Sequence, residues 1–316
     1  MKKYKKLVKT GVISSALLLT TWGLNKLIFL NATMKEILFC ENRYQYSWRF
    51  GNIFYTKKGS GSPVLFIHDL KSTGSAAEWN SVLNDLAKSH TVYAIDLLGC
   101  GRSEKLKMTY TNYIYVQLIN DFVKDVIRAK TDLVTSCSSS NIAIMSCYSE
   151  PELYNHLMLI NPPSMKVMAK YPKANHKTLK YLMEIPLIGT TIYNLIHSKR
   201  IIRNTCKKSF MHPNRCMNKD IDTMYEASHL SGPVSRYFYA SERSHFTNIH
   251  MIHALKKLNH SICIIGGEGQ KDIEHIMDSY TFYNPSIETE LIGDCKQYPH
   301  IEQKEAFEML CSIYLS

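Results

Sequence analysis

The sequence predicts an α/β fold built on a mostly parallel central sheet with helices on both faces. Short apolar runs rich in β-branched residues alternate with stretches of helical spacing, and such runs are typical of strands buried on both faces. The predicted strands are 52–57, 63–67, 91–95, 132–135, 157–160, 262–265 and 287–292. The predicted helices between and after them are 79–88, 113–130, 142–149 and 304–314, while residues 31–50 read as a connector. Parallel sheets of this kind bind ligands at the carboxyl ends of their strands.

The N-terminal segment, residues 1–30, resembles a membrane anchor or signal-like sequence. Five lysines within the first nine residues lead into an apolar stretch that begins at Leu7 or Gly11 and runs to Leu30, and Asn25 and Lys26 interrupt it. The stretch could just span a bilayer if Lys26 reached the far edge, or it could lie in the membrane interface. Because no convincing cleavage site follows, we expect an uncleaved single anchor.

The side of the membrane stays open at this stage. A basic N-terminal flank favours a cytoplasmic N-terminus, with the domain outside. The nine cysteines favour a reducing compartment, because their number is odd and their spacing suits neither a disulfide framework nor a metal site.

The net charge of +11 is consistent with a solvated basic surface or with attraction to anionic lipid headgroups. No nucleic-acid-binding module is recognisable, so no nucleic-acid partner is expected.

Residues 165–250 break the alternation of strands and helices. Helical patterns such as 179–195 and 224–229 occur there without a strong strand run. Because the segment is too long for one crossover connection, we interpret it as a helical cap inserted over the strand ends. The predicted parts are therefore the anchor at 1–30, the first part of the core at 31–164, the cap at 165–250 and the second part of the core at 251–316.

Two motifs resemble those of the α/β-hydrolase family. The run PVLFIHDL at 63–70 is similar to the strand and oxyanion loop that the family usually writes as His-Gly-x. The run DLLGCGRS at 96–103 resembles the family's D-x-x-G-x-G-x-S turn, whose glycines allow a tight backbone path. The resemblance covers about residues 50–165 strongly and 260–314 moderately, and implies an esterase- or lipase-like hydrolase with a degenerate catalytic triad.

The resemblance implies an oxyanion site at His68, Asp69 and Leu70, with a backbone N–H at Leu70 as donor. Asp69 replaces a glycine of the family pattern. A carboxylate beside a developing negative charge is unfavourable unless it points away or is paired.

The nucleophile is expected in the stretch TSCSSSN at 135–141, between a strand and a helix. The family pattern G-x-S-x-G needs small residues two positions before and after the nucleophile. We rank Ser138 first, Ser139 second and Cys137 third, although Cys137 fits the spacing to the neighbouring elements without a gap. A serine-rich loop that caps the following helix is the alternative.

The acid and the base of a hydrolase triad follow the nucleophile along the chain. The position of the acid is occupied by Gln270, with Asp272 able to replace it after a loop shift. The position of the base is occupied by Gln297, with His300 three residues later as a displaced base or a surface histidine.

Two main hypotheses follow. The first is a membrane-tethered serine hydrolase of a small or lipid-like carboxylic ester, with an apolar pocket in the cap. The second is a catalytically silent member of the fold that binds an apolar ligand or a protein partner. A thiol nucleophile at Cys137 is a third possibility, because a thiol at a helix N-terminus needs less help from a base. No cofactor is implied, since the sequence has no phosphate loop, dinucleotide fingerprint or metal cluster.

Overall fold

The computed structural model describes residues 2–40 and 43–315; in the first helix it describes the side chains of Tyr4 and of residues 14 onward. Its centre is an eight-stranded sheet in the order β1-β2-β4-β3-β5-β6-β7-β8. The strands are β1 (Tyr44–Trp48), β2 (Gly51–Lys58), β3 (Ser62–Ile67), β4 (His90–Ile95), β5 (Thr131–Ser136), β6 (Tyr154–Ile160), β7 (Ser261–Gly267) and β8 (Glu288–Ile292). Strands β3 to β8 run parallel, and β1 and β2 form an antiparallel hairpin at one edge. The predicted α/β fold is confirmed.

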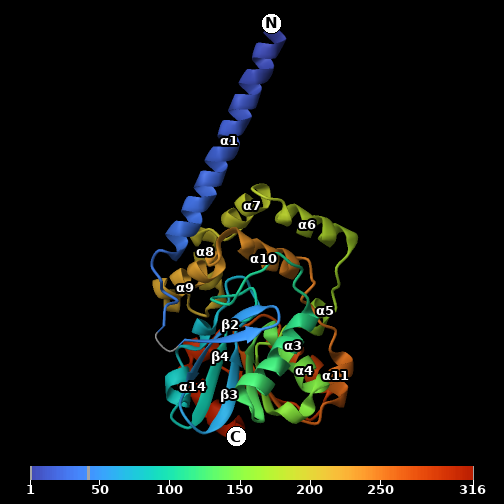
Figure 1. Ribbon diagram of the computed structural model, residues 1–316. Helices are drawn as coiled ribbons and strands as arrows, with labels where there is room; N and C mark the ends of the chain where they lie inside the picture. The colour runs from blue at the N-terminus through green and yellow to red at the C-terminus, as the bar shows by residue number, and fades with distance from the viewer. Residues whose placement is uncertain (1, 41–42, 316) are drawn as a thin grey trace.

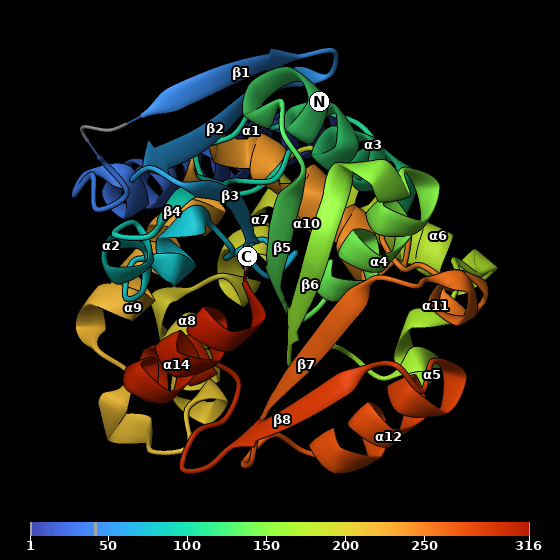
Figure 2. The ribbon, with the colours of Figure 1, turned by 90° about the horizontal axis from the view of Figure 1, so that it is seen from below.

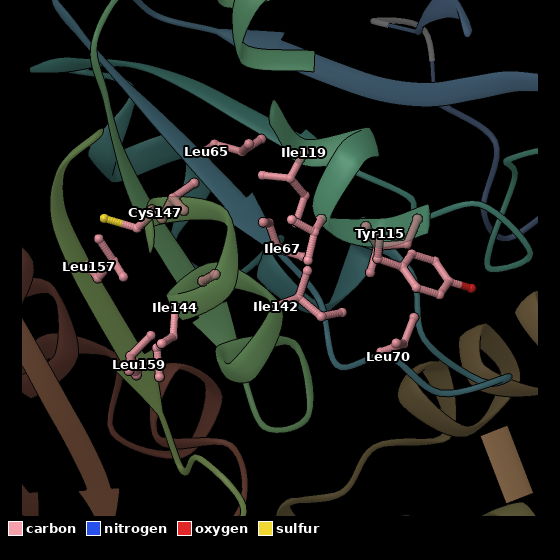
Figure 3. Packing of buried hydrophobic residues seen from close by; sticks show 14 of the residues in the cluster. Leu65, Ile67, Leu70, Tyr115, Ile119, Ile142, Ile144, Cys147, Leu157 and Leu159 are labelled. Carbon is pink, nitrogen blue, oxygen red and sulfur yellow. The ribbon is translucent and has the colours of Figure 1, made fainter. Parts of the chain in front are cut away.

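Helices cover both faces of the sheet (Figure 2). One face packs against α3 (Asn112–Phe122), α4 (Ser139–Ser149), α11 (Ile252–Lys257) and α12 (Ile273–Tyr283). The other face packs against α2 (Leu83–Leu86) and α14 (Lys304–Tyr314). Figure 3 shows Leu65 of β3 close to Ile119 of α3, and Leu157 of β6 close to Cys147 of α4. Burial on both faces explains why the strands read as continuous apolar runs.

The edge hairpin corrects the prediction of a connector over residues 31–50. Tyr44–Trp48 is a strand, paired with Gly51–Lys58. Its side chains are mostly exposed, in the burial pattern of an edge strand, so it carries no apolar run of the kind that marks the central strands.

Two predicted helices are shorter than expected. Residues 79–88 contain the end of a 3₁₀ turn at Ala76–Trp79 and the short helix α2. The helix predicted at 113–130 continues from α3 into one π-turn at Val123–Ile127 and ends at Arg128.

Residues 165–250 form six α-helices and no strand, above the carboxyl ends of the sheet strands (Figure 1). They are α5 (Met165–Met168), α6 (Ala174–Glu184), α7 (Ile188–Ile196), α8 (Lys199–Ser209), α9 (Asn218–His229) and α10 (Ser235–Arg243). The helical pattern at 179–195 is divided by a break at Pro186, which separates α6 from α7. We refer to α5–α10 as the cap helices.

The first helix, α1 (Lys2–Thr33), projects from the body beside the cap helices (Figure 1). Among the residues that the structure describes, no helix combines the length and the apolar character needed to cross a membrane. The membrane-spanning form of the predicted anchor is therefore not supported. Near its end α1 is docked on the cap: Asn25 donates to Thr191 Oγ1 and accepts from Asn194 Nδ2.

Candidate functional site

The turn between β5 and α4 has the geometry of a nucleophile elbow, centred on Cys137. Cys137 has a φ of +47°, a left-handed conformation that non-glycine residues seldom adopt. Its N–H donates to the carbonyl of Ile160 at 2.8 Å, and its carbonyl accepts from the N–H of Ser140 at 3.1 Å. These bonds fix the strained turn at the carboxyl end of the sheet, where the fold places its chemistry.

The two serines that the sequence analysis ranked first, Ser138 and Ser139, follow the elbow residue and make different contacts. Ser139 is buried at the start of α4, and its hydroxyl donates to the carbonyl of His68 at 2.5 Å. Ser138 is the residue after the elbow, and its backbone N–H donates to Asp69 Oδ1 at 3.0 Å. The residue with positive φ between β5 and α4 is thus a cysteine, Cys137, and neither of the two serines.

Asp69 occupies the position of an oxyanion. In this fold the N–H after the elbow residue stabilises the oxyanion of the reacting substrate. Here that donor, at Ser138, is already bound by the Asp69 carboxylate, whose second oxygen lies 2.5 Å from Lys71 Nζ. The N–H of Asp69 itself donates to Glu78 Oε2 at 3.1 Å. Asp69 is therefore held in the site by three separate contacts.

The side chains of the other predicted oxyanion residues have different contacts: His68 bonds to backbone groups, and Leu70 packs in the core. His68 Nε2 accepts from the N–H of Leu97 at 3.0 Å, which leaves Nδ1 to carry the proton and donate to the carbonyl of Asp69 at 2.7 Å. Burial lowers the pKa of His68, in keeping with a neutral ring. The side chain of Leu70 is buried in the core (Figure 3).

Gln297 faces the elbow where the family pattern has its base. Its side-chain amide nitrogen lies 3.7 Å from Cys137 Sγ. Asn161 positions this loop, because its side-chain nitrogen donates to the carbonyls of Lys296 and Gln297 while its oxygen accepts from Gly267 N–H. Nothing in the spacing of the sequence indicated this positioning role for Asn161.

His300 and Asp272 lie in other surroundings. His300 is fully buried, so the surface alternative is wrong. Its ring packs on Trp79, with ring centroids 4.3 Å apart, and neither ring nitrogen has a hydrogen-bond partner within residues 2–40 and 43–315. Its Nε2 lies 3.7 Å from Glu78 Oε1, and burial lowers its pKa to about 3. Asp272 is exposed at the N-terminus of α12.

The electrostatics of the site keep the thiol protonated. Burial, with a smaller contribution from the Asp69 carboxylate, raises the pKa of Cys137 to about 12 against the opposing effect of Lys71. Burial and Asp69 together raise the pKa of Glu78 to about 7. The pKa of Lys71 is raised despite desolvation, because its ammonium faces Asp69. Sequence reasoning missed Lys71 and Glu78, which lie outside the motifs.

Two cavities of about 280 Å³ each lie between this site and the cap helices, and Lys71, Thr73 and Met224 line both. The first also contacts Asp69, Glu78 and Tyr298. The second reaches Ile196, Ile201 and Tyr239 in the cap. Both are large enough for a small ligand, and the first reaches Asp69, whose carboxylate accepts from the N–H of the residue after the elbow.

Comparison with known families agrees with this fold. A sequence profile described as alpha/beta hydrolase fold matches residues 62–304. The chain therefore belongs to the α/β-hydrolase fold family.

Individual relatives are more distant. An uncharacterized protein of Mycobacterium tuberculosis is 30% identical over 103 residues, which are 33% of this chain and 30% of that protein. A 2-hydroxy-6-oxo-6-(2'-aminophenyl)hexa-2,4-dienoic acid hydrolase of Metapseudomonas resinovorans is 29% identical over 118 residues, 36% of this chain and 40% of that protein. The chain thus matches well under half the length of these curated relatives.

Solved structures share the architecture. A serine hydrolase involved in carbazole degradation has a TM-score of 0.69 at 16% identity, covering 86% of this chain and 97% of that one. An epoxide hydrolase has a TM-score of 0.68 at 18% identity, covering 85% and 97%. At these identities the likeness establishes the fold alone.

Proposed function

We propose that this α/β-hydrolase-family protein binds a small ligand beside its elbow and does not hydrolyse esters by the serine route. The observation that carries the proposal is the hydrogen bond from the Ser138 N–H to the Asp69 carboxylate. An ester carbonyl would have to displace a carboxylate that Lys71 also holds.

The groups around the elbow support the same conclusion. A nucleophile needs an adjacent base, but the side chain that faces the Cys137 sulfur from the loop after β8 is the Gln297 amide, which cannot take up a proton near neutral pH. The raised pKa of Cys137 leaves little thiolate at neutral pH. Loss of the general base alone typically lowers a rate by 10²–10⁴-fold.

The ligand would occupy the two cavities that flank Lys71. Apolar side chains such as Met224, Ile201 and Tyr298 line these cavities together with a few charged groups, as in many small-molecule sites. A lipid-like or aromatic body would suit this lining.

The test is turnover and covalent labelling of the full chain. We expect no hydrolysis of p-nitrophenyl acetate or butyrate above a heat-denatured control, and no fluorophosphonate label on Ser138 or Ser139 by peptide mass spectrometry. Label on either serine in the folded protein, absent after denaturation, would overturn the proposal.

A second candidate is hydrolysis through the Cys137 thiol, which its strained φ of +47° favours. The same assay decides between the two candidates. Ester turnover that disappears in Cys137→Ala, but persists in a Cys40→Ala control, would establish the thiol route.

We also propose that α1 attaches the protein to anionic membranes. Lysines dominate its N-terminus, and several large apolar side chains further along are exposed, among them Leu18, Trp22 and Leu27. The full chain should sediment with vesicles of phosphatidylcholine and phosphatidylserine, and Leu18→Ser/Trp22→Ser should weaken this binding. Equal sedimentation of both proteins would contradict an attachment through α1.

A further inference from the structure

The positive charge of the chain is concentrated at one end of the molecule. Residues 165–250 contain 14 lysines and arginines against 5 aspartates and glutamates, a net charge of +9. Residues 1–30 add six lysines and no acidic residue, whereas residues 251–316 have 5 basic and 10 acidic residues. The cap helices and α1, which lie together in Figure 1, therefore carry the excess.

The outer side of α6 and α7 is also apolar. Tyr181 is 72% exposed, Ile188 53% and Leu195 65%. Ile188 and Leu195 lie seven residues apart, about two helical turns, and so share one face of α7. The opposite face of α7 is buried through Tyr193 and Asn194. We call Tyr181, Leu182, Ile188 and Leu195 the α6–α7 face.

The exposed part of α1 and the α6–α7 face lie at the same end of the molecule. Asn25 of α1 is buried against α7 through its bonds to Thr191 and Asn194, while the part of α1 before Asn25 leaves the body beside α7 (Figure 1). A bilayer that contacts the exposed part of α1 would therefore also lie close to the cap.

We propose that the α6–α7 face rests on an anionic lipid bilayer as a second contact. This rests on the proposed attachment of α1 and adds an orientation to it. Exposed apolar side chains flanked by cations, here Lys177 on α6 and Arg200 at the start of α8, match the apolar and anionic layers of a lipid interface. A purely electrostatic partner such as nucleic acid would leave Ile188 and Leu195 without a role.

The orientation places one cavity close to lipid. Ile201, which is 45% exposed on the cap surface, also lines the cavity that contains Lys71 and Tyr239.

The experiment compares variants of the full chain on vesicles of phosphatidylcholine with and without phosphatidylserine. One variant removes apolar contacts, Ile188→Ser/Leu195→Ser, and a second reverses charge, Lys177→Glu/Arg200→Glu. The matched control, Met309→Ser/Ile313→Ser, changes two exposed apolar residues of α14 at the far end of the molecule. Hydrogen exchange of the bound protein locates the contact.

We expect each cap variant to lose about tenfold in vesicle affinity while the α14 control does not change. Peptides from α6 and α7 should gain protection on the vesicles. Binding without protection of α6 and α7 would overturn the cap contact and leave the α1 attachment standing. If neither α1 nor the α6–α7 face gained protection, the α1 attachment and the cap contact would both be wrong. Binding to a nucleic-acid oligomer with the same affinity as to vesicles would indicate a purely electrostatic surface instead.

Discussion

Asp69 is the residue on which the chemistry of this site depends. A side chain that replaces a glycine here accepts the hydrogen bond that the family reserves for a substrate. The same carboxylate acts on its neighbours, because it raises the pKa of both Glu78 and Cys137. The one carboxylate thus accepts the hydrogen bond of the Ser138 N–H and adds to the burial that keeps the Cys137 thiol protonated.

Glu78 should make stability depend on pH. Its pKa of about 7 exceeds the usual value of about 4.5, so the folded state holds the proton more tightly than the unfolded state. This contribution is complete below about pH 4.5 and is lost as the pH rises through about 7, a change of about 3 kcal/mol. Glu78→Gln keeps an acceptor for the Asp69 N–H and removes the titration.

Chemical unfolding at about pH 5 and about pH 8 measures this difference. Between about pH 5 and about pH 8, the free energy of unfolding should fall less in Glu78→Gln than in the unchanged chain. The exposed variant Glu305→Gln should show the same fall as the unchanged chain. Parallel pH profiles for all three proteins would contradict a buried, readily protonated Glu78.

Asp69→Asn should make Cys137 more reactive. The substitution removes a negative charge that disfavours the thiolate and leaves Lys71 to favour it. A fall of one unit in pKa increases the thiolate population about tenfold at neutral pH, and we expect a gain of about that size in the iodoacetamide reaction rate. Peptide mass spectrometry follows Cys137, with Cys40 as internal reference; an unchanged ratio of the two rates would refute the coupling.

Residue type guided the ranking of the nucleophile candidates in the sequence, and that ranking stays a prediction. Ser138 and Ser139 have the side chain that the family uses, but the elbow is defined by backbone conformation, and the positive φ belongs to Cys137. The count to the neighbouring elements did favour Cys137. By contrast, no sequence signal placed the Asp69 carboxylate on the Ser138 N–H, since that contact joins two loops 69 residues apart.

Among the elements, the central strands were predictable and the edge was not. Runs such as 63–67 and 262–265 are apolar because they are buried on both faces, and they form β3 and β7. The edge strand at Tyr44–Trp48 is half exposed and carries no such pattern. The last helix, α14, begins and ends where its apolar spacing predicts.

Asn25 should be essential for the docking of α1. Its amide pairs with Thr191 and Asn194 in a buried contact, so Asn25→Ala leaves the Asn194 amide without that acceptor. Such a loss costs about 1–3 kcal/mol. Hydrogen exchange should increase over residues 20–33 and 188–196 with the sheet unchanged. Leu24→Ala, at an exposed neighbouring position, should leave exchange as it is; a loss of protection throughout the sheet would mean a global effect instead.

At the scale of the whole molecule, the placement of charge matters more than its total. The segment 165–250 carries a net +9 and the segment 251–316 a net −5, so the two ends of the molecule differ in sign. Because screening in salt confines electrostatic attraction to about 10 Å, a bilayer would respond to the nearer end.

Raising the net charge at the far end should therefore do little for membrane binding. Glu274→Lys/Glu305→Lys adds four charges at exposed positions of α12 and α14, and we expect its affinity for phosphatidylserine vesicles to stay within about twofold of the unchanged chain at physiological salt. Lys177→Glu/Arg200→Glu changes the total by the same amount in the opposite direction but should weaken binding about tenfold. If the first variant bound about tenfold more tightly, net charge alone would explain the attraction and the oriented contact would be wrong.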